Sequence, residues 1–289
     1  MIQLLHISDT HAFAEGTRDA VALSQRLGIP LVHTGDMVQD YYGQDITYAY
    51  PGTMLFCVGN HDVWTESLPR QYVDQTKLYA TYYAPYAAGR DCVQVDPDTW
   101  WYKDIEGVRL ISLDCLCDGS VMARQLTWLE NVIAECEWCV VLSHMAPRSL
   151  QPHACCLTCS AYYSTTFVSP EEQDQMTYSP GLKQLYGALL PHKDKILIEL
   201  CGHEHADCIG MAPDWPVSVI GSTIIDSYNN VHRSTDTLQN RCVANLVRIA
   251  PGDFCAIYRL GAIGRTNGER GRMVVYDYKN KRFVAEVSR

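Results

Sequence analysis

Short apolar runs rich in β-branched residues recur along the first two thirds of the chain, and each run ends abruptly in polar residues. Such runs are typical of strands that are buried inside a protein. We therefore predict strands over residues 2–7, 31–33, 54–58, 108–113, 140–142 and 196–201.

Three segments between these strands carry apolar residues at the spacing of amphipathic helices. We expect the first helix to be capped by Thr17 and to stop at Gly28, and the second to start at Ser120. The third is expected to start around Pro180 and to end at Pro191. Because strands and helices alternate up to about residue 205, the sequence predicts an α/β core.

The pattern changes after residue 205, where strand-like segments follow one another without helical periodicity between them. Lys279-Asn280 fits a hairpin turn between the last two segments. A second, mostly antiparallel sheet packed on the first would account for these strands. The predicted segments are 217–220, 243–249, 255–260, 273–278 and 282–287.

Metal-ligand side chains follow nearly every strand predicted in the first two thirds. In open α/β sheets the carboxyl ends of parallel strands form the ligand crevice, so these side chains are expected to converge. Seven candidates are too many for one tetrahedral site, and they suit two metals that share a bridging carboxylate. The candidates are Asp9, His11, Asp36, Asn60, His144, His203 and His205.

Two adjacent metals can hold a bridging hydroxide and clamp a phosphoryl group, so the chemistry implied is phosphoester hydrolysis. Imidazole, carboxylate and amide ligands accept manganese, iron, zinc or nickel, and the sequence does not decide between them.

The order and spacing of these motifs resemble the signature of the calcineurin-like metallophosphoesterases. The motifs lie within residues 7–205: Asp9-x-His11, Gly35-Asp36, Gly59-Asn60-His61-Asp62, His144 and Gly202-His203-x-His205. The resemblance implies an α/β (α+β) fold, a four-layer αββα sandwich of two mixed β-sheets flanked by helices. It would form a single domain over 1–289, with a mostly β part over 206–289.

The resemblance also implies a role for each motif residue. Asp36 would bridge the two metals. His61 would protonate the leaving oxygen or stabilise the transition state, and Asp62 would orient His61. The first metal would be held by Asp9, His11 and His205, and the second by Asn60, His144 and His203.

Substrate contacts are expected from Asn60 and His61, and Arg148 could pair with a phosphate, although a solvated loop position is the alternative. A tyrosine ligand typical of purple acid phosphatases is replaced by Gln39. The pattern therefore resembles the compact group that includes class III cyclic-nucleotide phosphodiesterases. Whether the substrate is a phosphomonoester or a small phosphodiester depends on the unassigned insertions 64–107 and 145–177.

The alternative function is a non-catalytic metal-binding scaffold of the same fold. Three further residues near strand ends have ordinary explanations. We expect His6 and His33 to be hydrogen-bonded core residues, and Asp114 to serve a turn or a helix cap.

Acidic residues outnumber basic ones by 33 to 23 in the 289 residues, which gives a formal net charge of -10. This balance argues against general nucleic-acid binding and against a membrane surface as partner, and favours a small-molecule phosphoester. The sequence starts without a signal-like segment, and no apolar run reaches the roughly 18 residues of a membrane span. We therefore expect a cytoplasmic protein.

The 13 cysteines are an odd number in a long chain, which favours reduced core residues over a disulfide framework. The densest group is Cys155, Cys156 and Cys159, which contains one C-x-x-C. A structural zinc site normally needs a second pair, and we identify no clear partner for this one. We therefore do not expect zinc there.

Overall fold

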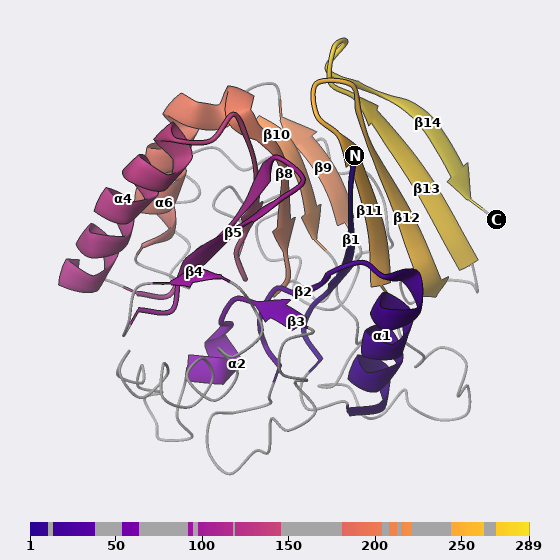
Figure 1. The fold of residues 1–289 in the computed structure, drawn as a ribbon, viewed down its shortest axis with the longest axis horizontal. Helices are drawn as coiled ribbons and strands as arrows, with labels where there is room; N and C mark the ends of the chain where they lie inside the picture. The colour runs from indigo at the N-terminus through magenta and orange to yellow at the C-terminus, as the bar shows by residue number, and fades with distance from the viewer. Residues whose placement is uncertain are drawn as a thin grey trace.

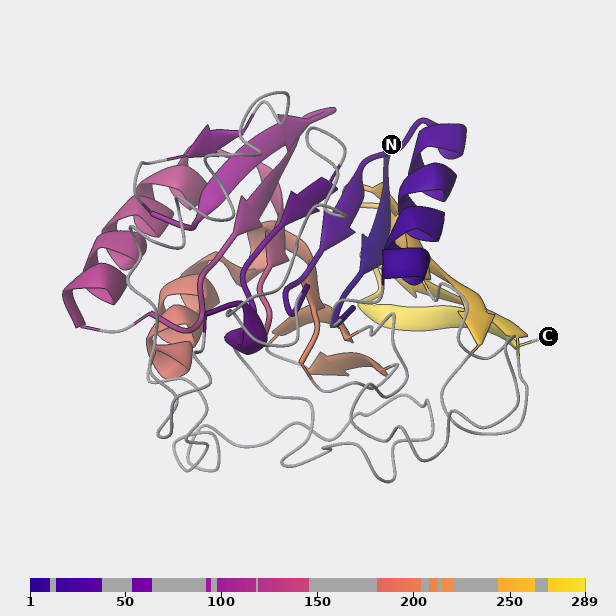
Figure 2. The same cartoon turned by 90° about the horizontal axis from the view of Figure 1, so that it is seen from below.

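The computed structural model describes residues 1–10, 14–37, 54–63, 92–94, 98–117, 119–145, 181–203, 208–212, 215–220, 244–262 and 270–288. These residues form two mixed β-sheets that pack together, with helices on the outer sides (Figures 1 and 2). The fold is the two-sheet α+β sandwich expected from the sequence. That the whole chain is one domain stays a prediction.

The first sheet has seven described strands in the order β14-β13-β12-β11-β1-β2-β3. The parallel part is β1–β3, and the C-terminal strands are antiparallel to their neighbours. The strands are β1 (Ile2–Ile7), β2 (Leu31–His33), β3 (Met54–Phe56), β11 (Ala244–Ala250), β12 (Phe254–Ala262), β13 (Arg270–Asp277) and β14 (Arg282–Ser288).

The second sheet also has seven described strands, in the order β4-β5-β6-β7-β8-β10-β9. Its centre is parallel, because β6, β7, β8 and β10 run in one direction. The strands are β4 (Val93–Gln94), β5 (Trp101–Ile105), β6 (Val108–Ser112), β7 (Trp138–Leu142), β8 (Ile196–Cys201), β9 (Cys208–Ala212) and β10 (Trp215–Ile220).

Helices cover the outer side of each sheet. Helix α1 (Ala14–Leu27) contacts β1 and β2 of the first sheet, whereas α4 (Gly119–Ala134) and α6 (Leu182–Leu189) pack together beside the second (Figure 1). The 3-10 helix η3 (Leu190–Lys195) leads from α6 into β8, and the short α2 (Asn60–Val63) follows β3. Among the described helices, none is long and apolar enough to cross a membrane.

One expectation about the sheets is wrong. The C-terminal strands do not form a separate second sheet, because β11 pairs antiparallel with β1, with Leu4 opposite Val247, and thereby extends the first sheet. The second sheet is built instead from the strands in the middle of the chain. Apolar alternation identifies a strand but not its partner, so the sequence pattern could not decide this point.

The element boundaries differ from the sequence expectations in two places. Helix α1 begins at Ala14, so Thr17 is buried inside the helix instead of capping it. Helix α6 runs from Leu182 to Leu189, within the expected limits, and Pro191 lies near the start of the 3-10 helix η3 that follows it. Strands β4 and β5 lie in the insertion that had no assignment, because β5 carries Lys103 and Asp104 and lacks a continuous apolar run.

Hydrogen bonds between the sheets fix their relative position. The indole Nε1 of Trp101 on β5 donates to the carbonyl of Phe56 on β3 at 2.8 Å. After β13, the hydroxyl of Tyr278 donates to the carbonyl of Leu197 on β8, also at 2.8 Å. Trp100 and Trp101 are both fully buried, as packing residues are expected to be. The first bond holds the carboxyl end of β3 against the second sheet, and the second bond holds the start of β8.

Candidate metal centre

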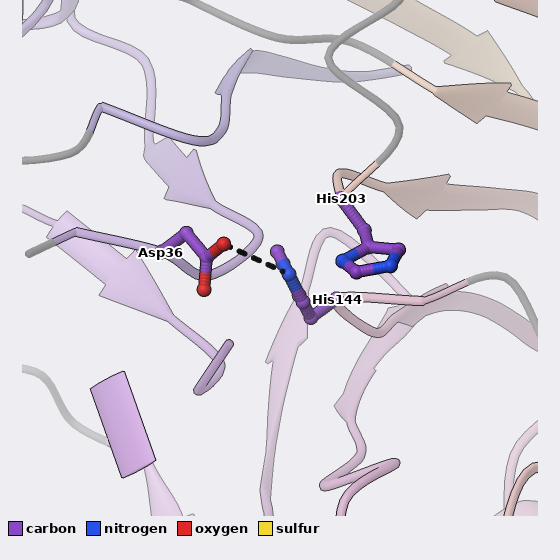
Figure 3. Close-up of side chains that lie close together, drawn as sticks. All are labelled: Asp36, His144 and His203. Carbon is purple, nitrogen blue, oxygen red and sulfur yellow. Dashed lines mark ion pairs between the residues drawn. The ribbon is translucent and has the colours of Figure 1, made fainter. Parts of the chain in front are cut away.

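Three side chains from both sheets meet where the parallel strands end. Asp36 follows β2, His144 follows β7 and His203 follows β8. One ligand atom from each lies within 4.8 Å of the other two, and Figure 3 shows the Asp36 carboxylate facing the His144 ring. Carboxylate oxygen and imidazole nitrogen suit divalent manganese, iron or zinc, so the donor set fits a metal ion.

The two ring nitrogens of His144 have different partners. Nδ1 lies 2.8 Å from the carbonyl oxygen of Thr34, which can only accept, so Nδ1 carries a proton. Nε2 faces the site, 3.3 Å from Asp36 Oδ2 and 2.9 Å from Asn60 Oδ1. Metal-binding histidines commonly donate one N–H to a carbonyl in this way, which leaves the other nitrogen for the ion.

His203 and Asn60 join the loops of the two sheets. The Nδ1 of His203 lies 2.8 Å from Asn60 Oδ1, the same oxygen that faces His144. The backbone N–H of His203 donates to Asp9 Oδ1 at 2.9 Å. Asp9 and Asn60 therefore border the same centre as His203. They follow strands of the first sheet, whereas His203 follows a strand of the second.

His61 lies beside the cluster at the start of α2. Its backbone N–H donates to Asp36 Oδ1 at 2.8 Å, and its ring Nε2 is 4.0 Å from Asp36 Oδ2. The residue is only 6% exposed. Its ring is thus close to Asp36 Oδ2, the oxygen that faces His144.

Asp62 fixes the loops that carry Asp36 and Asn60. Oδ2 accepts the backbone N–H groups of Asp36 and Gly59, both at 2.8 Å, and Oδ1 accepts that of Met37 at 2.9 Å. One buried carboxylate therefore ties the loop after β2 to the loop after β3. The sequence interpretation assigned Asp62 to orienting the His61 ring, which stays a prediction, and it missed this bracing role.

Glycines allow the loops to approach closely at the centre. A Cβ on Gly59 would collide with Asp36 Oδ1, and a Cβ on Gly202 would collide with Ser8 Oγ. Three candidate ligands also adopt left-handed backbone conformations, with φ of 53° at Asp9, 57° at Asp36 and 71° at His203. Such conformations are uncommon outside glycine, and they concentrate at functional sites.

The buried carboxylates favour positive charge at the centre. Burial lowers the pKa of His144, but the charge and hydrogen bond of Asp36, with a smaller effect of Asp9, outweigh it and raise the pKa to about 9. The same negative potential attracts a divalent cation.

His6, His33 and Asp114 have the structural roles expected from the sequence. His6 is buried and lies 2.9 Å from Thr34 Oγ1, and the Nε2 of His33 lies 3.0 Å from Thr10 Oγ1. Asp114 accepts hydrogen bonds from Thr99 Oγ1 at 2.7 Å and from the Leu116 N–H at 2.9 Å, which is a turn role. Thr10 and Thr34, which hydrogen-bond these histidines, were not singled out from the sequence, although Thr34 directly follows β2.

Several predicted residues lie outside the part of the chain that the structure describes. They are His11, His205, Arg148 and the cysteines Cys155, Cys156 and Cys159. Most of the insertions 64–107 and 145–177 also lies outside it.

The sequence model of the calcineurin-like phosphoesterases matches residues 2–207, so the chain belongs to this family. The match spans every motif residue from Asp9 to His205. The family consists of metal-dependent phosphoesterases, which agrees with the donor set of the centre. No functionally curated protein matches the chain.

Solved structures resemble this chain at low sequence identity, and the first of those named here shares its fold. A dimetal phosphatase from Danio rerio is 12% identical, covers 96% of this chain and 99% of its own, and has a TM-score of 0.59. A putative 5'-nucleotidase from Staphylococcus aureus is 12% identical, over 92% of this chain and 55% of its own, with a TM-score of 0.47. A purple acid phosphatase from yellow lupin (Lupinus luteus) seeds is 12% identical, over 99% and 53%, with a TM-score of 0.46.

Proposed function

We propose that the protein hydrolyses phosphoester bonds with two divalent metal ions held at the ends of its parallel strands. The observation that carries the proposal is the convergence of Asp36, His144 and His203, whose ligand atoms lie within 4.8 Å of one another. They come from three strands and from both sheets, so a packing accident is a poor explanation for the convergence.

The positions of Asp36, Asn60, His144 and His203 support part of the ligand assignment. Asp36, whose Oδ2 faces both His144 and His61, would bridge the two ions. Asn60, His144 and His203 would hold one ion, because one ring nitrogen of each histidine lies within 2.9 Å of Asn60 Oδ1. By the resemblance of the motifs to the family signature, Asp9, His11 and His205 would hold the other ion.

Two such ions supply a hydroxide nucleophile near neutral pH and neutralise charge on the phosphoryl oxygens. The role of the chain is to position the substrate and to move a proton. Asn60 would orient the phosphoryl group through its side-chain amide, and His61 would donate a proton from its ring to the leaving oxygen. The bracing of both loops by Asp62 keeps these groups in place.

We propose a small phosphomonoester or phosphodiester as the substrate. The formal net charge of -10 disfavours long nucleic acids, which require many cationic contacts. Manganese, iron and zinc all suit the donor set. A non-catalytic scaffold of the same fold would bind metal without turnover, and this difference makes the two functions distinguishable.

The experiment that tests the proposal is a comparison of Asp36→Asn with Asp114→Asn. Both change a buried aspartate at a strand end, but only Asp36 belongs to the cluster. We expect Asp36→Asn to lower metal affinity by more than about 100-fold, because changes to partners of ligands alone cost roughly 10–100-fold. Metal content after dialysis and hydrolysis of p-nitrophenyl phosphate are the two readouts.

The Asp114→Asn variant should retain both metal and turnover. If Asp36→Asn kept its full metal content and normal turnover, the bridging role would be wrong.

A further inference from the structure

A row of buried polar residues crosses three neighbouring strands of the first sheet, β1, β11 and β12 (Figure 1). His6 on β1 lies opposite Asn245 on β11, and Asn245 lies opposite Arg259 on β12. Residues directly opposite on paired strands share one face of a sheet, so the three side chains are neighbours. His6 and Asn245 are fully buried, and Arg259 is 3% exposed. Burying polar groups is costly, yet the proposed hydrolysis gives none of the three a task.

Hydrogen bonds join the row from end to end. Arg259 Nη1 donates to Asn245 Oδ1 at 3.3 Å, and Asn245 Nδ2 donates to the Nδ1 of His6 at 3.4 Å. The Nε2 of His6 lies 2.9 Å from Thr34 Oγ1. The carbonyl of the same threonine accepts the Nδ1 proton of His144 at 2.8 Å. A continuous polar path therefore runs from β12 to a candidate metal ligand.

Arg259 sets the direction of the bonds in this path. A guanidinium has donors only, so Asn245 turns its oxygen toward Arg259 and its NH₂ group toward His6. Burial, with the charge of Arg259, lowers the pKa of His6 to about 3, so the ring stays neutral. Its Nδ1 then accepts, and its Nε2 carries the proton that is donated to Thr34 Oγ1. One tautomer of His6 is thereby selected.

Thr34 connects the row to the metal centre. Its backbone N–H donates to the carbonyl of Ile7 at 3.0 Å, its hydroxyl accepts from His6, and its carbonyl accepts from His144. The bond from His6 fixes the side chain of this threonine, and the other two fix its backbone. A carbonyl held in this way orients the imidazole that donates to it, as partners of metal-bound histidines do.

We propose that Arg259 and Asn245 are positioning residues of the metal centre, which orient His144 through His6 and Thr34. This role rests on the proposed function, because it takes His144 as a metal ligand. Both residues lie outside residues 2–207, the part of the chain that the family model matches. The C-terminal strands β11 and β12 therefore contribute to metal affinity without supplying a ligand.

The test compares the zinc affinity of Arg259→Gln and Arg259→Lys with that of the unchanged full-length protein, by competition with a chromophoric chelator. Lysine keeps a cation with donors only, so the direction of the path is retained. Glutamine also has an amide oxygen, which can accept from Asn245, so the selection of one His6 tautomer is lost. We expect Arg259→Gln to weaken zinc binding by about 10-fold, the lower end of the range for partners of metal ligands, and Arg259→Lys by less than about threefold.

The matched control is Arg109→Gln on β6. Arg109 is another buried arginine, and it donates to Asp104 and to the carbonyl of Val132. It lies opposite Cys139 near the start of β7, whereas His144 follows the end of that strand. The control should lower the stability of the fold and leave zinc affinity unchanged, which separates a general effect of losing a buried arginine from positioning.

A second measurement reads the tautomer of His6 by heteronuclear NMR of its ring nitrogens, in the full-length protein with and without zinc. We expect a proton on Nε2 and none on Nδ1 in the unchanged protein and in Arg259→Lys, and a mixture of tautomers in Arg259→Gln. This readout does not depend on activity, and for the unchanged protein it does not depend on whether a variant folds.

The proposal is overturned if His6 carries its proton on Nδ1 in the unchanged protein. It is also overturned if Arg259→Gln binds zinc as tightly as the unchanged protein, or if Arg259→Lys loses as much affinity as Arg259→Gln. In each of these cases the unchanged protein still binds zinc. Absence of zinc binding by the unchanged protein would instead contradict the proposed function, and the positioning role with it.

Discussion

His144 has two ring nitrogens, and the surrounding structure gives each a separate task. Nδ1 donates to Thr34, and Thr34 Oγ1 in turn lies 2.9 Å from the ring of His6. Nε2 points at Asp36 and Asn60. Buried polar networks of this kind fix the orientation of a ligand before a metal binds, so the centre is preorganised at the level of single residues.

The role of His61 leads to a prediction about leaving groups. His61→Ala should slow hydrolysis of an alkyl phosphate by about 10²–10⁴-fold, the usual contribution of a general acid. Hydrolysis of p-nitrophenyl phosphate should fall much less, because its weakly basic leaving group departs without a proton. Steady-state rates on both substrates check this prediction, with His192→Ala on η3 as the control. Equal losses on both substrates would contradict a role in protonation.

Burial of His6 predicts a dependence of stability on pH. Burial, with the charges of Arg259 and His33, lowers the pKa of His6 from 6.5 to about 3, so the folded protein keeps it neutral. The unfolded chain binds the proton first, so this contribution is complete above pH 6.5 and is lost as pH falls toward 3. Its slope is about 1.4 kcal/mol per pH unit within that window.

The measurement for His6 is urea unfolding at several pH values between 7 and 4.5, roughly the window in which its linkage operates. His6→Gln keeps a hydrogen-bonding side chain and cannot titrate. The variant should lose less free energy of unfolding on acidification than the unchanged protein. Parallel pH dependences in the two proteins would show that His6 does not carry this linkage.

Glycines control how closely the elements approach. A Cβ on Gly202 would lie 2.5 Å from Asp9 Oδ2 and 2.9 Å from Ser8 Cβ, so the loops after β1 and β8 must separate to accept it. We expect Gly202→Ala to lower the free energy of unfolding by about 1–3 kcal/mol, as overpacking does. Its metal affinity should fall too, because Asp9 and His203 are hydrogen-bonded across this contact.

The matched control is Gly187→Ala in α6, where a Cβ meets nothing within 4 Å. Alanine is favoured over glycine inside a helix, so this variant should gain up to about 1 kcal/mol. Urea unfolding measures both variants. A neutral Gly202→Ala would mean that the strand ends are less tightly packed than the structure indicates.

Some strands could be predicted from the sequence, and others could not. The strands β1, β2 and β8 were predicted with their observed bounds, because each is a continuous apolar run that ends in polar residues. Strand β5 was missed, since Lys103 and Asp104 interrupt its apolar run. The convergence of Asp36, His144 and His203 follows from the rule for strand ends, whereas the bracing by Asp62 depends on loop paths that no local pattern records.

At the scale of the whole molecule, the centre depends on two sheets held at their carboxyl ends. The first sheet supplies Asp9, Asp36 and Asn60, and the second supplies His144 and His203. The chain also returns at its C-terminus to place β11 beside β1, which extends the first sheet. Sequence patterns indicated most strands of this arrangement but not the long-range pairing that decides which sheet each strand joins.

The measurement that tests the central proposal most directly is hydrolysis of p-nitrophenyl phosphate and bis-p-nitrophenyl phosphate by the protein reconstituted with manganese. The account predicts turnover of at least one of the two substrates, abolished by a chelator and restored by added metal. Preference for the diester would indicate a phosphodiesterase, and preference for the monoester a phosphatase. Tight metal binding without turnover of either substrate would contradict the account and favour a non-catalytic scaffold.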